Sequence, residues 1–232
     1  MNSFYGMPWE IFRTNAILPH QKRAVTFFTK SGGQPGYVSN IFAVPDYNLG
    51  ITILVAGNPV LLGEIRDIVT VPLIQAADVI AQDQLRHKYA GEFATSQLNS
   101  SITLSHSPTH GLHISRWISN GTDMLSAIPT YFSFAQSGFR TQLVPTFLYR
   151  DVRQQTGERW RLLVTKLGED DHSIWGDFCV TDIDTLMYDG RPLNEAVFWN
   201  EDENGRFTSL ELTAFRLVMD RLGEERLAVQ EL

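Results

Sequence analysis

The hydrophobic pattern of the chain changes twice, and each change predicts a different kind of structure. Residues 23–28 form an apolar, β-prone run of the kind that strands show. Apolar residues then recur at helical spacing from Leu61 to Ile80, with acidic and amide side chains mostly between them. From about residue 89 onward, short alternating runs are separated by turn residues, as in β-rich domains. We therefore expect a strand region, then a helix, then a β-rich part.

The helical segment carries recognisable end signals. Asn58 can cap it, and Pro59 suits its first turn. Pro72 lacks a backbone N–H, so we expect it to kink or divide the helix. An apolar stripe of this length is typical of a helix that packs across a sheet.

The β-rich part begins after a boundary near residues 86–88. Strands are predicted at 89–93, 101–104, 112–117, 141–149, 159–167, 178–180, 196–199 and 207–217. Turns are predicted at 120–121 and 202–205, and a polar loop at 168–172. By periodicity alone, residues 210–222 also fit a helix. The many aromatic residues of this part indicate an aromatic core, either plainly packed or holding a small apolar ligand.

The strand at 23–28 ends in Thr29-Lys30-Ser31-Gly32-Gly33, which carries the clearest chemistry in the chain. Lys30 supplies a positive charge, and the Ser31 hydroxyl can bond to a carboxylate or carbonyl oxygen. The two glycines let a substrate approach the main chain closely. The triplet Lys30-Ser31-Gly32 matches the third motif, Lys-Thr-Gly or a variant, of the penicillin-interacting serine enzymes.

The neighbouring residues extend this match into a family resemblance. Gly6-Met7-Pro8-Trp9-Glu10-Ile11-Phe12-Arg13 and Lys30-Ser31-Gly32-Gly33-Gln34-Pro35-Gly36-Tyr37 resemble two consecutive strands of a fungal branch of the class C-type serine β-lactamase-like family. Residues 38–44 and 50–56 resemble the two strands that follow, and the part from about residue 90 resembles the extra C-terminal β domain of that branch.

The resemblance implies an α+β fold. Residues 1–86 would be a partial β-lactamase/transpeptidase-like antiparallel sheet with its covering helix, and residues 87–232 an antiparallel β barrel or sandwich. It also favours strand over helix at 210–222.

The same resemblance assigns roles to the motif. Lys30 would support the proton relay, Ser31 would bond the substrate carboxylate or carbonyl, and the N–H of Gly33 would be one oxyanion-hole donor beside Gly32. The implied partner is a small-molecule acyl substrate, and no cofactor is implied.

Two motifs of the complete family are missing from the printed sequence. Ser-x-x-Lys, which carries the nucleophile, does not occur, and Tyr37-Val38-Ser39-Asn40 has the wrong spacing for Tyr-x-Asn. Covalent catalysis needs a nucleophile held against its base. We therefore expect a truncated or partial serine hydrolase, inactive as this chain alone, whose complete family performs acyl-enzyme hydrolysis or transfer. The alternative is a non-catalytic protein, in which the β domain binds a ligand or partner and the first segment is scaffold.

Composition narrows the function classes. A chain of 232 residues with 43% hydrophobic residues suits one or two folded domains. Its net charge of -7 argues against general nucleic-acid binding. No apolar run reaches the length of a membrane span, and no signal peptide is visible. Glycosylation sequons at Asn99 and Asn120 favour secretion of a complete parent protein.

Other candidate sites have weaker support. His106, His110 and His113 cluster, but Pro108 and Gly111 interrupt any helix that would present them to zinc. Cys179, the only cysteine, reads as a small buried residue. The pairs Asp170-Asp171 and Asp182-Ile183-Asp184 lack the pattern of a calcium loop. We expect no metal site.

A last expectation concerns self-association. The helix can cover only one face of the first sheet, so an apolar side is expected to stay partly bare and to attract a second copy. This side is expected to comprise Val25, Phe27, Ile41, Ala43, Ile51, Ile53 and Val55.

Overall fold

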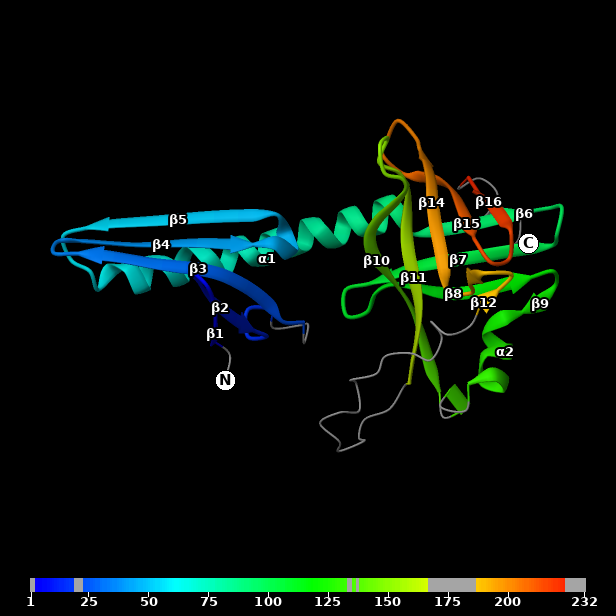
Figure 1. Ribbon diagram of the computed structural model, residues 1–232, viewed down its shortest axis with the longest axis horizontal. Coiled ribbons are helices and arrows are strands. Elements are labelled where there is room, and N and C mark those ends of the chain that lie inside the picture. The colour runs from blue at the N-terminus through cyan, green and yellow to red at the C-terminus, as the bar shows by residue number, and fades with distance from the viewer. Residues whose placement is uncertain (1–2, 19–22, 133–134, 137, 167–186, 224–232) are drawn as a thin grey trace. The chain divides into compact units, whose positions relative to one another are not determined.

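The first part of the chain forms a five-stranded antiparallel sheet in the order β1-β2-β3-β4-β5 (Figure 1). The structure is a computed structural model that describes residues 3–18, 23–132, 135–136, 138–166 and 187–223. The strands are β1 (Ser3–Gly6), β2 (Trp9–Thr14), β3 (Val25–Gln34), β4 (Tyr37–Val44) and β5 (Leu49–Ala56). A short 3₁₀ helix, η1 (Pro45–Tyr47), joins β4 to β5. By their contacts, Met1–Gln84 and Leu85–Leu232 form two compact units.

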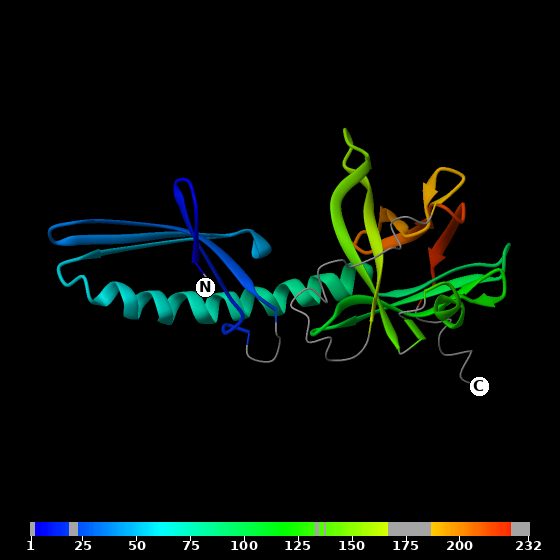
Figure 2. The same cartoon turned by 60° about the horizontal axis from the view of Figure 1, so that its bottom comes forward.

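Helix α1 (Leu61–Tyr89) runs along one face of this sheet (Figure 2). The Oδ1 atom of Asn58 accepts the N–H of Val60 at 3.1 Å, as expected of a capping residue. Ile74 is fully buried against the sheet, and Gln75 donates to the carbonyl of Ile17 at 2.9 Å. The buried core of this unit is formed by Ile17, Leu18, Val25, Phe27, Phe42, Val44, Ile51, Ile53, Val55 and Ile74.

Of the two outcomes expected at Pro72, a kink or a division, the division does not occur, because α1 runs as one helix through this residue. Thr70 and Ile74, on either side of the proline, are both buried. Their packing holds the helix on the sheet and offsets the roughly 3 kcal/mol that an interior proline costs.

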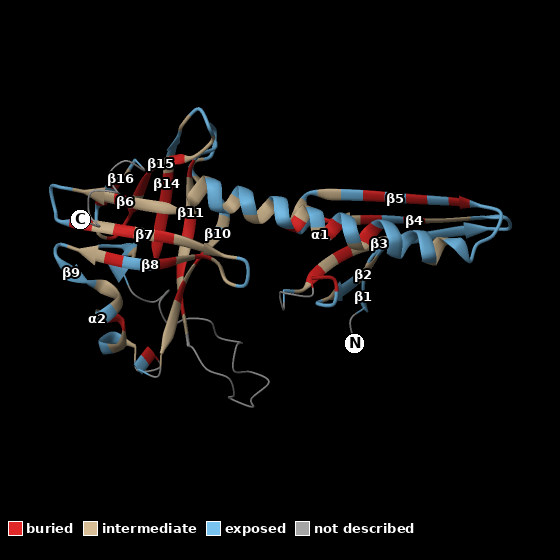
Figure 3. Ribbon diagram, turned by 180° about the vertical axis from the view of Figure 1, so that it is seen from behind, coloured by how far each residue is buried: buried red, intermediate tan, exposed pale blue. Residues whose placement is uncertain are grey.

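The residues expected to form an uncovered apolar face of the first sheet are mostly not exposed. Val25, Phe27, Ile51, Ile53 and Val55 are all buried, on the face that α1 covers. Ile41 is 47% exposed, because its partner in the register is Lys30 and both residues lie on the opposite face. Figure 3 shows buried and exposed positions alternating along β5. Leu54 of β5 is 76% exposed and shares the uncovered face.

The second unit is an eight-stranded antiparallel barrel with the strand order β10-β11-β14-β15-β16-β6-β7-β8, closed by a pairing of β8 with β10. Its strands are β6 (Gly91–Thr95), β7 (Ser100–Ser107), β8 (Gly111–Ser119), β10 (Phe139–Asp151), β11 (Thr156–Lys166), β14 (Glu195–Glu201), β15 (Phe207–Leu212) and β16 (Leu217–Arg221). A short β9 (Thr122–Asp123), helix α2 (Met124–Tyr131) and the small hairpin of β12 (Met187–Tyr188) with β13 (Arg191–Pro192) complete the described elements. The predicted α+β fold is confirmed, and of the two expected forms of the β domain, barrel or sandwich, the structure shows the barrel.

The barrel interior is filled by side chains. Tyr89, Trp160, Phe198 and Phe207 pack with ring centroids 4.7–5.6 Å apart. Among the described residues, the interior hollow under Trp117 and Leu143 has a volume of only about 10 Å³. Such a space holds at most about one water molecule, so the described interior offers no room for an organic ligand.

The observed strands agree with most of the expected ones, and the differences lie at element ends. Strand rather than helix after residue 207 is confirmed by β15 and β16. The strand expected at 89–93 begins only at Gly91, because α1 continues through Tyr89. Helix α2 was not anticipated, although Asp123 caps it by accepting the N–H groups of Leu125 and Ser126. The expected loop at 168–172, the strand at 178–180, Cys179 and the paired aspartates lie outside the described residues.

Candidate functional site

The Lys-Ser-Gly motif lies on a stretch of β3 that has lost its neighbour on one side. Although β3 is the middle strand of its sheet, its pairing with β2 ends at Thr29, opposite Glu10. Residues 30–34 continue alone on that side and remain paired only with β4. The motif therefore occupies a local open edge of the sheet.

The hairpin register decides which backbone groups face this edge. The two-residue turn Pro35-Gly36, with Gly36 at φ +86°, pairs Gln34 with Tyr37. Hydrogen-bonded and non-hydrogen-bonded pairs alternate along antiparallel strands, so the N–H groups of Ser31 and Gly33 point away from β4. Consistent with this direction, the outward carbonyl of Ser31 accepts the Lys30 ammonium at 3.1 Å. The Ser31 N–H bonds to the Glu10 carboxylate, so the Gly33 N–H is the outward backbone donor that an oxyanion at the open edge can approach.

A carboxylate from β2 contacts both polar side chains of the motif. Glu10 Oε1 accepts a hydrogen bond from Lys30 Nζ at 2.9 Å, and Glu10 Oε2 accepts one from Ser31 Oγ at 3.4 Å. Asn40, which is opposite Ser31 in the register, donates Nδ2–H to Ser31 Oγ at 2.9 Å and is itself buried. Ser31 is therefore held from two neighbouring strands.

The electrostatics of this group are set mainly by Lys30. The hydrogen bond from Lys30 holds the pKa of Glu10 below its ordinary value, against a smaller opposing effect of desolvation. Charge attraction to Lys30 and the bonds from Ser31 act in the same direction. A carboxylate with a lowered pKa is a weak general base, so Glu10 is poorly suited to activate Ser31 as a nucleophile.

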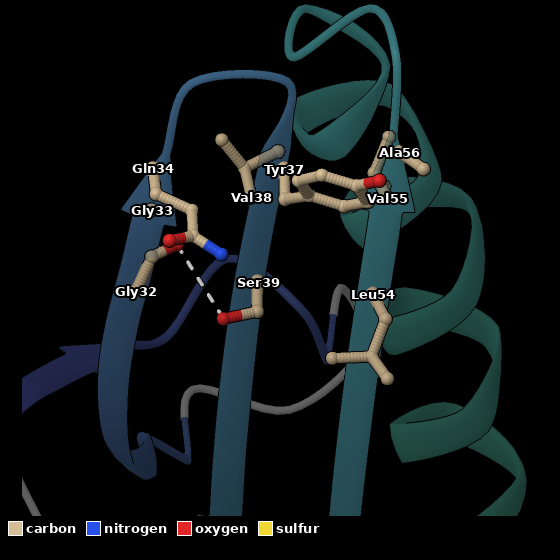
Figure 4. Close-up of a pocket in the computed structure, with 9 residues that line it drawn as sticks. All are labelled: Gly32, Gly33, Gln34, Tyr37, Val38, Ser39, Leu54, Val55 and Ala56. Carbon is tan, nitrogen blue, oxygen red and sulfur yellow. Dashed lines mark hydrogen bonds between the residues drawn. The ribbon is translucent and has the colours of Figure 1, made fainter.

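Two hollows flank the motif. One, of about 470 Å³, is lined by Gly32, Gly33 and Gln34 together with residues of β4 and β5, among them Tyr37 and Leu54 (Figure 4). The other, of about 510 Å³, lies on the helix side of the sheet. Its polar wall is formed by Glu10, Ser31, Asn40, Arg66 and Asp67.

The glycines differ in the room around them. A Cβ on Gly32 would lie 2.9 Å from Ser39 Oγ, which donates to the Gly32 carbonyl at 3.4 Å. A Cβ on Gly33 would come no closer than 3.6 Å to its neighbours. A Cβ on Gly32 would therefore require the Ser39 side chain to rotate, whereas Gly33 leaves space that a ligand can approach.

Within the described residues, the expected cluster of His106, His110 and His113 does not form a metal site. The ring of His110 contacts Arg140 Nη1 at 2.9 Å, and burial followed by the Arg140 charge lowers the His110 pKa. Burial likewise lowers the pKa of His106. Across the described part of the chain, no group of three or more His, Cys, Asp or Glu residues is arranged to hold a metal ion. No described helix combines the length and apolar character that crossing a membrane requires.

Sequence reasoning named Lys30, Ser31, Gly32 and Gly33, and missed Glu10 and Asn40. Asn40 could have been found by counting back from the Pro35-Gly36 turn, which places it opposite Ser31. Glu10 could not, because the connection from β2 to β3 is too long for its register to be counted from the sequence.

Comparisons with known proteins find similarity to β-lactamase-like proteins and to proteins named as hydrolases. Residues 81–223 match the family described as "Beta-lactamase-like-like, C-terminal domain". The chain is 36% identical over 235 residues to "Probable hydrolase M10" of a Phoma species, and 35% identical over 242 residues to "Probable hydrolase clz13" of Cochliobolus lunatus. It is 24% identical over 246 residues to a "Beta-lactamase-like protein" of Arthroderma benhamiae.

The alignments cover 95%, 97% and 93% of this chain, in the same order, but only 39%, 38% and 41% of these relatives. The chain thus spans about two fifths of their length. No solved structure matches it.

Proposed function

Because the chain belongs to the β-lactamase-like hydrolase family, we propose that it is the substrate-binding part of a serine hydrolase that acts on an ester or amide through an acyl-enzyme. The observation that carries this proposal is the open edge of β3, where a cation, a hydroxyl and the outward N–H of Gly33 lie within a few residues. Such a set can bind a carboxylate or the carbonyl oxygen of an acyl group.

In this proposal Lys30 and Ser31 recognise the substrate, and the N–H of Gly33 is one oxyanion donor. One such donor contributes about 2.7–4 kcal/mol to transition-state stabilisation in well-studied hydrolases. The second donor and the nucleophile would come from a Ser-x-x-Lys segment that the printed sequence does not contain. The chain alone is therefore a partial and inactive member of a family whose complete members are longer.

Kinetics of the printed chain test this proposal. We expect no burst and no saturable turnover of a chromogenic β-lactam or a short-chain nitrophenyl ester, and the same background rate from Lys30→Ala. Saturable hydrolysis that Lys30→Ala abolishes would contradict the inactivity of the chain.

The nucleotide sequence upstream of the Met1 codon provides an independent test. An in-frame Ser-x-x-Lys together with Tyr-x-Asn supports the proposal that a catalytic part precedes the binding part. A stop codon just before Met1 favours a non-catalytic binding or scaffold protein instead.

A further inference from the structure

Three arginines converge on one buried carboxylate on the barrel. Glu195 Oε1 accepts Arg150 Nη2 at 2.6 Å, and Glu195 Oε2 accepts Arg159 Nη2 at 2.6 Å and Arg161 Nη1 at 3.3 Å. Thr213 Oγ1 completes the shell, donating to Oε1 at 3.1 Å. We call Arg150, Arg159 and Arg161 the arginine cluster.

The cluster lies on the outer surface of the barrel. Arg159 and Arg161 alternate along β11 with Trp160 and Leu162, which are buried in the barrel core. Arg161 is paired in the register with Glu195 of β14, and Arg150 is supplied by β10 on the other side of β11. Three adjacent strands therefore build one face (Figure 1).

Burial is divided unequally within this group. The side chain of Glu195 is 2% exposed, whereas those of Arg150, Arg159 and Arg161 are 37%, 29% and 28% exposed. The carboxylate is thus enclosed, and the guanidinium groups form its cover. Each guanidinium carries five N–H donors, and the bonds to Glu195 and Thr213 use only some of them.

The charges do not balance within the group. Three guanidinium charges meet one carboxylate, and no other acid in the described part of the chain pairs with these arginines. Arg159 and Arg161 even share one oxygen of Glu195, which brings like charges close together. This positive excess belongs to a protein whose net charge is -7.

The local backbone makes room for this arrangement. Gly157, at φ +71°, faces Arg150 and Trp199, and a Cβ there would lie 2.9 Å from Arg150 Cβ and 2.5 Å from the Trp199 ring. Glycine lets the Arg150 side chain pass over β11 towards Glu195.

We propose that the arginine cluster is a binding site for a small oxyanion, a carboxylate or a phosphate group, on the outside of the barrel. Glu195 fixes the inner edges of the guanidinium groups, so their outer edges are already oriented before a ligand arrives. A planar guanidinium pairs with either kind of oxyanion through two parallel N–H bonds. The bound anion offsets the repulsion among the arginines.

The test uses the full chain at low salt, with inorganic phosphate and acetate as separate probes. The Nε–Hε NMR signals of Arg159 and Arg161 are expected to shift saturably, with half-saturation at or below about 10 mM, a weak affinity typical of small anions. Added sodium chloride should weaken the binding, because an exposed charge pair is screened. A preference for phosphate assigns the site to phosphate groups, a preference for acetate assigns it to carboxylates, and both outcomes support the site.

Matched variants locate the effect. Arg161→Gln removes the arginine with the longest contact to Glu195 and should weaken binding about tenfold, as the loss of one charged hydrogen-bond pair does. Arg153→Gln removes the same charge from the exposed β10–β11 turn and should leave binding within about twofold. Circular dichroism establishes that each variant is folded.

Signals of Arg159 and Arg161 that do not shift saturably in the unmodified chain would overturn the proposal, whatever the variants do. So would an equal loss of affinity in Arg153→Gln and Arg161→Gln, since it would reduce the binding to general surface charge.

Discussion

Glu10 Oε1 lies 2.9 Å from Lys30 Nζ, so the cation of the Lys-Ser-Gly motif already has a carboxylate partner on the neighbouring strand. The same carboxylate reaches Ser31 Oγ with its other oxygen, at 3.4 Å. Neighbouring residues of a strand point to opposite faces. Glu10 is the last residue of β2 that pairs with β3, opposite Thr29, so no β2 residue is paired with Lys30 or Ser31. The Lys30 side chain can therefore reach around the open edge to the Glu10 carboxylate, which also contacts Ser31. Any carboxylate ligand that binds at this edge would have to compete with Glu10 for the same ammonium.

We predict that the low pKa of Glu10 depends on Lys30. Lys30→Met should raise the Glu10 pKa towards its ordinary value of 4.5, because the first cause of the lowering is the bond from Lys30. Lys30→Arg retains the charge and should retain a lowered pKa. A carbon-13 NMR titration of the Glu10 carboxyl measures both. An unchanged midpoint in Lys30→Met would show that another group lowers it.

We predict that Glu195 stabilises the barrel in a pH-dependent way. Glu195→Gln should lower the free energy of unfolding at pH 7 by about 2–4 kcal/mol, since it leaves three arginines without their carboxylate. The arginines hold the folded pKa of Glu195 below its ordinary value of 4.5, although burial alone would raise it. Its contribution is therefore present above pH 4.5 and lost as the pH falls through the folded pKa.

Urea unfolding at pH 7 and at lower pH compares the two proteins. Acidification should cost the unmodified chain more stability than it costs Glu195→Gln. Glu203→Gln, in the exposed turn before β15, is the matched control and should stay within about 0.5 kcal/mol. If acidification lowers the free energy of unfolding equally in all three proteins, Glu195 is not the cause of the pH dependence.

We predict that the aromatic core governs barrel stability. Phe198 is fully buried and contacts the rings of Tyr89, Phe93, Trp160 and Phe207, so Phe198→Ala should cost about 3–5 kcal/mol. Phe147 is 86% exposed, and Phe147→Ala should change stability by less than about 0.5 kcal/mol. Thermal and urea melts of the two variants give the comparison, and similar losses would contradict the described packing.

We predict that the full chain self-associates through the sheet face that α1 does not cover. Ile41 and Leu54 expose apolar surface there, and Tyr37 is 60% exposed nearby. Light scattering should show species larger than a monomer, and Leu54→Glu should reduce them. The fragment 87–232 should be soluble and folded by itself. A monodisperse, cooperatively melting monomer of the full chain would refute this prediction.

Hydrophobic periodicity and turn residues were enough to predict the helix from residue 61 and most of the barrel strands, and the family resemblance decided strand over helix after residue 207. The helix does not divide at Pro72, because the burial of Thr70 and Ile74 outweighs the tendency of a single proline to end a helix. Ile41 was assigned to the wrong face of the sheet, because neighbouring residues of a strand point to opposite faces and the register was not known from the sequence.

The candidate site shows the same limit. Lys30 and Ser31 are adjacent in sequence, and a known motif identifies them. Glu10 and the arginine cluster depend on which residues of distant strands meet. Arg161 and Glu195 face each other only through the pairing of β11 with β14, which no turn signal between them sets. Such contacts are decided by the three-dimensional fold and leave no local sequence pattern.

The closure of the barrel has a consequence for how it opens. Two of its joints are narrow: β8 meets β10 at one residue pair, Gln142 with His113, and β16 meets β6 at two. The second joint is fastened by Arg221, which donates to the carbonyls of Phe207 and Lys88. The first joint is held by Thr141 of β10, whose Oγ1 donates to the carbonyl of Ile114 in β8 at 2.8 Å. Even with this bond, β8 and β10 share one residue pair, whereas β11 and β14 share four. Amide protons of β8 and β10 that face this joint should therefore exchange with solvent before those between β11 and β14.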